Sequence, residues 1–234
     1  MKLIVDSKIF EAFPNFLLGA VVVKNINNQK NKDKTEDILR QAEKETVQKY
    51  QGSEVIEISE IACWRDAYRV FGSKPKEYPS SLESVMRRVL KENQLPSINP
   101  LVNIYNAMSL FSLLPAGGED IDKIKGGISL TYASSAEAPI KLLGDDKEEA
   151  PYEGEIIYKD EVGALCRRWN WREAERTKLT YETKNAILVL EAIIPLKKEE
   201  LKNALEKMKE YIEGYCGGMC SFFILESKNP EETL

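Results

Sequence analysis

The segment Leu95-Pro96-Ser97-Ile98-Asn99-Pro100-Leu101-Val102-Asn103-Ile104-Tyr105-Asn106 contains the clearest helix start in the chain. Asn99 is a residue type preferred at the N-cap, and Pro100 fits the first helical position, where no backbone N–H is needed. A largely apolar run follows as far as Leu114, and Pro115 ends it. The sequence therefore predicts a helix that begins after Asn99 and stops before Pro115.

Strand and helix patterns are intermixed on both sides of this helix. Capping-box spacings predict helix starts at Asp33 with Glu36 and at Ser80 with Glu83, and an amphipathic pattern predicts a third helix over 197–215. Short apolar or alternating runs are typical of strands, and the sequence predicts them at 3–5, 17–23, 54–58, 128–132, 155–158, 162–165, 186–194 and 221–225. Because strands and helices do not alternate regularly, the pattern favours an α+β fold over a doubly wound sheet.

The composition excludes several classes of site. The 234 residues include no histidine, so a Ser-His-Asp or Cys-His pair and an H-E-x-x-H zinc site are excluded. Of the four cysteines only Cys216 and Cys220 are close in sequence, and a structural zinc site needs four ligands. We therefore expect reduced thiols, no metal and no cofactor. No apolar run is long enough for a signal peptide or a membrane span, so we expect a cytoplasmic protein without membrane contact.

The segment 166–178 is locally basic in a chain whose net charge is −5. It carries five positive and two negative side chains, together with Trp169 and Trp171. Arginine forks bind phosphates or carboxylates, and tryptophan faces stack on bases or aromatic groups. The same residues also have a structural interpretation, because arginine packed over tryptophan is a common cation–π arrangement.

Several motifs in order give the chain a family resemblance. The opening segment is followed by 115–122, 126–128, 154–157 and 186–192, and together they resemble the B3/4 domain of the phenylalanyl-tRNA synthetase β subunit. The free-standing (solo) version of that domain is similar from about Phe10 to about Phe223. This resemblance implies one layered α+β domain over 1–226, with mixed β-sheets flanked by helices. We expect residues 227–234 to form a frayed C-terminal tail.

The resemblance also implies a function. In the synthetase this domain holds the editing site, which hydrolyses tyrosine wrongly esterified to phenylalanine tRNA. We therefore expect a tRNA-binding, editing-like domain that acts on mischarged aminoacyl-tRNA in trans as an ester hydrolase. We do not expect an aminoacylating synthetase, because these 234 residues contain neither its catalytic core nor its anticodon-binding part.

The expected site residues follow from the same resemblance. Glu191 resembles the pocket glutamate of the closing motif, where it can orient a water or bind an α-ammonium group. The expected substrate- or tRNA-binding residues are Asn103, Asn106, Arg167, Arg168, Trp169, Asn170, Arg176, Thr177 and Thr180. Gly117 stands where bacterial synthetases have a histidine facing the pocket, so we expect a cavity with changed chemistry.

Alternatives to each role stay open at the level of the sequence. Asn103 and Asn106 can equally be loop-capping amides, and Glu191 the salt-bridge partner of one of the arginines. A net charge of −5 favours local contact with a tRNA acceptor end, or with a small ligand, over general RNA binding. The alternative functions are a non-catalytic sensor of an amino acid or nucleotide, and an interaction module that uses the 197–215 helix.

Overall fold

A computed structural model describes residues 1–91, 93–193 and 198–234. One sheet has the strand order β12 (Glu231–Thr233), β1 (Lys2–Val5), β4 (Ile128–Tyr132), β7 (Ile156–Lys159), β8 (Ala164–Arg167) and β9 (Arg172–Glu173). A four-stranded sheet has the order β11 (Met219–Leu225), β2 (Leu17–Lys24), β10 (Ala186–Ala192) and β3 (Ala116–Asp120). Strands β5 (Ile140–Lys141) and β6 (Glu148–Glu149) form a small separate hairpin.

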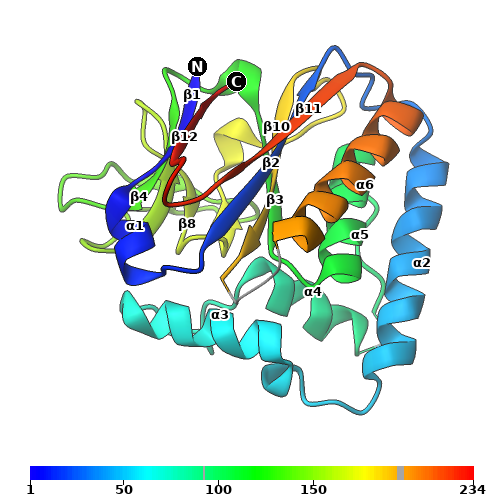
Figure 1. The fold of residues 1–234 in the computed structure, drawn as a ribbon, viewed down its shortest axis with the longest axis horizontal. Coiled ribbons are helices and arrows are strands. Elements are labelled where there is room, and N and C mark those ends of the chain that lie inside the picture. The colour runs from blue at the N-terminus through cyan, green and yellow to red at the C-terminus, as the bar shows by residue number, and fades with distance from the viewer. Residues whose placement is uncertain (92, 194–197) are drawn as a thin grey trace.

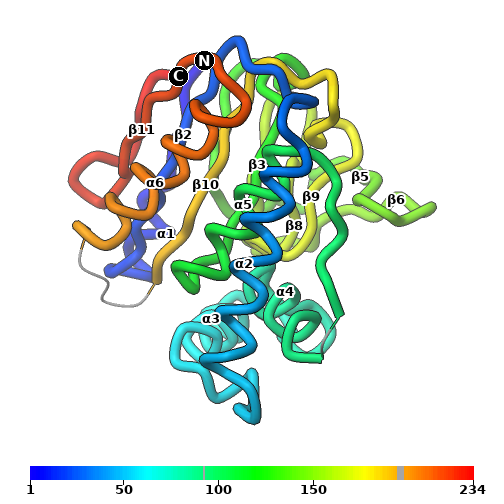
Figure 2. Tube along the Cα trace, turned by 90° about the vertical axis from the view of Figure 1, so that its right-hand side faces the viewer, coloured from blue at the N-terminus to red at the C-terminus, as the bar shows by residue number. Residues whose placement is uncertain are grey.

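Most of the helices gather on one side of the four-stranded sheet and below it, whereas the shortest helix lies on the other side, near β4 (Figure 1). The helices are α1 (Ser7–Ala12), α2 (Lys32–Tyr50), α3 (Ser59–Val70), α4 (Ser81–Val89), α5 (Pro100–Ser112) and α6 (Lys198–Cys216). Figure 2 shows α5 and α6 lying along this sheet, with α2 outside α5 and with α3 and α4 at one end. None of the helices in the described residues is long and apolar enough to cross a membrane.

Two large apolar layers of the core are separated by the four-stranded sheet, and a further cluster, the helical core, lies among α2, α3, α4 and α5. One layer lies between the two sheets and includes Leu3, Leu130 and Ile187. The other lies between the four-stranded sheet and helices α5 and α6, and includes Leu188 and Leu205. Successive residues of β10 therefore face opposite layers, because side chains alternate along a strand. The predicted α+β architecture is confirmed, and its sheets are mixed, since β1 pairs with β4 in parallel and with β12 in antiparallel orientation.

Helix α5 starts where its sequence predicts. The Asn99 side chain accepts a hydrogen bond from the backbone N–H of Val102, and Pro100 is the first helical residue. Its other contacts hold the start of α5 to the neighbouring loops, because the Asn99 amide donates to the carbonyl oxygen of Leu179 at 3.2 Å. This anchored start fixes the register of α5, and thus which of its side chains reach the space between the sheets.

Two local predictions are wrong for identifiable reasons. The proposed capping box at Asp33 is not formed, because α2 already begins at Lys32 after Asn31, which adopts a left-handed conformation and donates to the carbonyl of Tyr215. The alternating run 54–58 forms the 3-10 helix η1 (Val55–Glu57) instead of a strand. Alternation over so few residues fits both conformations, and here Val55 and Ile58 pack into the helical core.

The predicted tail is also corrected. Residues 231–233 form β12, which pairs with β1 through Lys2 and Thr233, so the two termini lie side by side (Figure 1). The exposed edge of β1 offers unpaired backbone groups that this short segment satisfies. Two predicted segment ends, Ile194 of the strand and Lys197 of the helix, lie outside the described residues.

Candidate functional site

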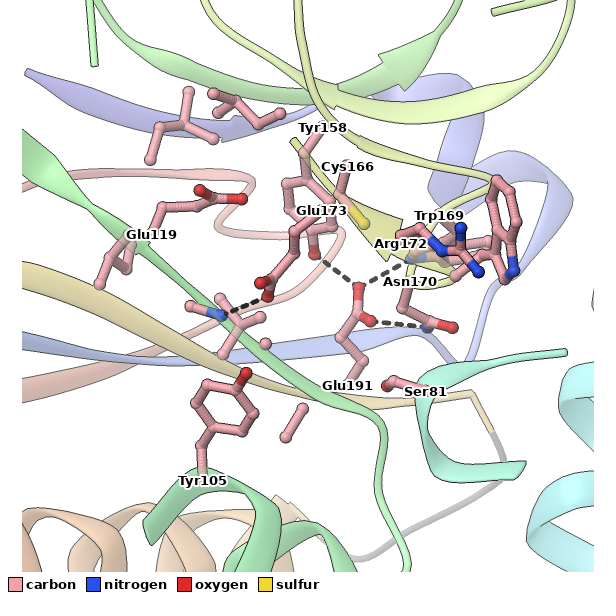
Figure 3. A pocket seen from close by; sticks show the side chains of 18 of the residues that line it. Ser81, Tyr105, Glu119, Tyr158, Cys166, Trp169, Asn170, Arg172, Glu173 and Glu191 are labelled. Carbon is pink, nitrogen blue, oxygen red and sulfur yellow. Dashed lines mark hydrogen bonds between the residues drawn. The ribbon is translucent and has the colours of Figure 1, made fainter. Parts of the chain in front are cut away.

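A cavity of about 220 Å³ lies between the two sheets and reaches the middle of α5 (Figure 3). Its walls come from β1, β4, β7, β8 and β9 on one side and from β3 and β10 on the other, while α5 contributes Tyr105 and Asn106. Most of the lining is apolar. The polar exceptions include three carboxyl groups, those of Glu119, Glu173 and Glu191, which approach the same region from different strands (Figure 3).

Glu191 faces this cavity because it shares the face of β10 that carries Ile187 and Val189. Its carboxylate is held by three donors. Oε1 accepts from the Tyr158 hydroxyl at 2.5 Å and from Trp169 Nε1 at 2.8 Å, and Oε2 accepts from Asn170 Nδ2 at 2.7 Å. A carboxylate offers about four acceptor sites, so one remains for a ligand.

The environment of Glu191 also sets its protonation. The side chain is 1% exposed, and this burial raises its pKa to about 7, although the three donors act in the opposite direction. Burial disfavours the charged form of a carboxyl group, while hydrogen bonds to the anion favour it. The result is a carboxyl group that changes its charge near neutral pH.

Trp169 and Asn170 reach Glu191 through an unusual turn after β8. Arg168 and Trp169 both have positive φ, at 47° and 66°. The turn places the Trp169 ring, which is fully buried, against an aromatic cluster. It also lets the Asn170 side chain accept from the Tyr68 hydroxyl at 2.9 Å while it donates to Glu191. The strained turn thus positions two of the three donors.

Glu173 and Glu119 were not identified from the sequence. Glu173 Oε1 accepts from the backbone N–H of Gly118 at 2.9 Å, and burial raises the Glu173 pKa to about 7. Burial, and then the neighbouring Glu173 carboxyl, raise the pKa of Glu119 well above its usual range. A Cβ added at Gly117 would lie 2.9 Å from Glu173 Oε1. The Glu173 carboxyl group therefore occupies the space next to Gly117, the position where the sequence predicts a change of chemistry.

The three predicted arginines do not converge on the cavity. Arg167 is buried and forms a forked pair with Glu155, at 3.0 Å from Nε and 2.8 Å from Nη2. Arg176 forms a similar pair with Asp160, at 3.0 and 2.6 Å. The guanidinium carbon of Arg168 lies 3.6 Å from the ring centroid of Tyr78.

The arginines therefore contact other groups of the protein, in agreement with the interpretation of this segment as structural. Their partners are carboxylates and Tyr78 as well as tryptophan. The Arg168 group also lies 5.0 Å from the Trp171 ring. Glu191 is not a salt-bridge partner of these groups, because its described partners are Tyr158, Trp169 and Asn170.

The remaining predicted residues divide between the cavity and the core. Asn106 lines the cavity, whereas Asn103 is fully buried and donates to Ser97 and Thr35, as a structural amide does. Thr177 is fully buried, and its hydroxyl has no hydrogen-bond partner among the described residues. Thr180 lines a second cavity of about 350 Å³.

The model of the B3/4 domain family matches residues 63–217, which is more than half of the chain. This chain belongs to the B3/4 domain family. Among solved structures it is similar to an N-terminal fragment of the phenylalanyl-tRNA synthetase β subunit from Pyrococcus horikoshii, with 16% identity, a TM-score of 0.48 and 93% of this chain covered. The chain spans about half the length of that structure, 49%. No curated protein matches it.

The chemistry available in this B3/4 domain is that of carboxyl groups. Burial raises the pKa of the Cys166 thiol, which also lines the cavity, well above its usual range, so the thiol is protonated and inert near neutral pH. Within the described ranges no group of three or more His, Cys, Asp or Glu side chains is arranged to hold a metal ion. A largely apolar cavity lined by carboxyl groups favours a ligand that combines a cationic group with an apolar one.

Proposed function

We propose that this B3/4 domain binds the aminoacyl end of tRNA in the cavity between its sheets and hydrolyses the ester. The observation that carries the proposal is the Glu191 carboxylate, which is fixed by three donors and keeps an acceptor site in a largely apolar cavity. An α-ammonium group buried there would need such a partner, because an unpaired charge is costly away from water.

The size of the cavity supports an aminoacyl ligand. About 220 Å³ is smaller than the roughly 300–1,000 Å³ typical of pockets for drug-sized molecules. The cavity therefore suits one amino-acid side chain and its amino group, while the bulk of a tRNA stays outside. Hydrolysis of the ester needs no protein nucleophile, since a positioned water and a group that accepts its proton are sufficient.

A second candidate is the non-catalytic binding of a free amino acid. The observation in its favour is that Arg167, Arg168 and Arg176 are already paired inside the protein, which removes the phosphate contacts that the basic segment would offer to tRNA. Glu191 would then bind the ammonium group of the free amino acid in the same position.

A deacylation assay separates the two candidates. The protein is incubated with tyrosyl-, phenylalanyl- and other aminoacyl-tRNAs, and ester loss is compared with that in buffer. We expect acceleration for at least one of them. We expect kcat/KM to fall by about ten- to a hundredfold in Glu191→Gln, which loses a charge-assisted contact, and to be unchanged in Glu148→Gln, whose side chain is exposed on β6.

The outcomes are distinct. Ester loss at the rate of buffer with every aminoacyl-tRNA would rule out the hydrolase. A change in tryptophan fluorescence with free amino acids and none with tRNA would then identify the amino-acid binding module, with Trp169 as the reporter beside Glu191.

A further inference from the structure

The Glu173 carboxyl group lies against the backbone of β3, at a position where Gly117 has no side chain. An added Cβ at Gly117 would come within 2.9 Å of Oε1, and the backbone N–H of Gly118 donates to the same oxygen at 2.9 Å. Any larger residue at 117 would displace the carboxyl group. Only Oε1 has a hydrogen-bond donor among the described residues, so Oε2 is available to the cavity.

A second carboxyl group accompanies it. Glu119 lies two residues after Gly117 on the same face of β3, and its buried Oε2 has no hydrogen-bond partner among the residues that the structure describes. Two neighbouring carboxyl groups, one buried and one half-buried, do not both ionise easily, so one of them stays protonated near neutral pH. Burial first, and then the Glu173 charge, keep the Glu119 pKa well above its usual range, so Glu173 is the member that ionises.

Glu173 also stands where two cavities meet. The cavity that contains Glu191 and the second cavity, of about 350 Å³, share Tyr105, Leu143 and Glu173 in their walls. The second cavity is lined further by Lys178 and Thr180, and Glu191 is not among its lining residues. A molecule with its acyl part beside Glu191 and its alcohol part in the second cavity has its ester group at the shared wall, within reach of Glu173.

We propose that Glu173 is the catalytic base of the site, and that the second cavity receives the alcohol part of the ester. This assignment rests on the proposed ester hydrolysis. The Glu173 carboxylate takes a proton from a water molecule while the oxygen of that water bonds to the ester carbonyl carbon. The bond from that carbon to the ribose oxygen then breaks, and the ribose oxygen receives the proton. One water is consumed, and an amino acid and a tRNA with a free hydroxyl are released.

The test is single-turnover deacylation of whichever aminoacyl-tRNA the wild type hydrolyses fastest. Glu173→Gln keeps an oxygen that accepts from Gly118 and removes the base, so we expect the rate to fall by about 10²–10⁴-fold. Saturation with substrate occupies Glu191, and the remaining pH dependence reports Glu173. We therefore expect the wild-type rate to rise with pH through about 7 and the Glu173→Gln rate to lack that rise.

A second variant keeps the test independent of that one substitution. Gly117→Ala places a methyl group against Glu173 Oε1 and moves the carboxyl group while leaving it in the protein, so we expect a lower rate with the pH dependence retained. Glu148→Gln serves as the control, because its exposed side chain lies outside both cavities.

Three results would contradict the assignment. If the wild type hydrolyses no aminoacyl-tRNA, the proposed function fails and this role fails with it. If the wild type is active and Glu173→Gln matches its rate, only the role of Glu173 is overturned. If Glu173→Gln is slower but keeps the wild-type pH profile, the residue supports the structure and is not the base.

Discussion

Replacement of Trp169 by alanine is expected to lower the free energy of unfolding by about 3–5 kcal/mol, as for other buried large aromatic residues. The ring is fully buried and lies 4.9, 5.1 and 5.0 Å, centroid to centroid, from Phe13, Phe16 and Trp64. The substitution removes these contacts and also the 2.8 Å hydrogen bond to Glu191. Urea unfolding followed by far-UV circular dichroism measures the change.

Two further variants separate packing from hydrogen bonding at this position. Trp169→Phe keeps an aromatic ring and removes the N–H donor, so we expect a smaller loss of about 1–3 kcal/mol. Phe111→Ala serves as a control on a partly exposed aromatic residue, at 36% exposure, and should change stability by less than about 1 kcal/mol. A Trp169→Ala variant as stable as Phe111→Ala would contradict the packing described for this cluster.

Replacement of Arg167 by methionine is also expected to lower the free energy of unfolding, by about 3–5 kcal/mol. Glu155 is fully buried, and its carboxylate is held by the Arg167 fork at 3.0 and 2.8 Å. Without Arg167 the carboxylate retains the backbone N–H groups of Arg168, at 2.9 Å, and Tyr152, at 3.2 Å, and the more distant Arg168 guanidinium at 3.6 Å, but it loses its closest charge partner. The reason for the cost is thus the buried charge left behind, and thermal unfolding measures it.

The double variant Arg167→Met with Glu155→Leu tests that reason. Removal of both charges should recover most of the lost stability, because a buried ion pair can be replaced by apolar residues at little cost. Arg69→Met breaks an exposed pair with Asp66 and should change stability by less than about 1 kcal/mol. If Arg167→Met behaves like Arg69→Met, Arg167 is not a structural residue and its phosphate-binding role becomes open again.

The sequence predicts a helix start correctly where that start depends only on a few neighbouring residues. Asn99 with Pro100 and Ser80 with Glu83 mark the helix starts correctly, because an N-cap hydrogen bond spans only three residues. Strand β3 was not predicted, since Ala116–Asp120 contains two glycines and has little intrinsic preference for a strand. Its conformation comes from antiparallel pairing with β10, which is far away in the sequence.

The site was predictable only in part for the same reason. The family resemblance places Glu191, Trp169 and Asn170 among the expected site residues, and in the structure Trp169 and Asn170 donate hydrogen bonds to Glu191. The arginines were expected to bind phosphate or carboxylate groups of a ligand. The sequence does not show that, in the folded chain, Arg167 pairs with Glu155 and Arg176 with Asp160. In the sequence Glu173 is one of several charged residues in the segment 166–178. Its place in the cavity depends on β9 packing over Gly117, and a sequence does not show this contact.

The most direct test of the account is whether Glu191 binds the α-ammonium of an aminoacyl group. Calorimetry would use an adenosine that carries tyrosine or phenylalanine through an amide in place of the ester, together with the same compounds lacking the amino group. We predict that loss of the amino group and Glu191→Gln each weaken binding by about ten- to a hundredfold, and that the two changes together weaken it no further. Equal binding of the compounds with and without the amino group by the wild type would contradict the account.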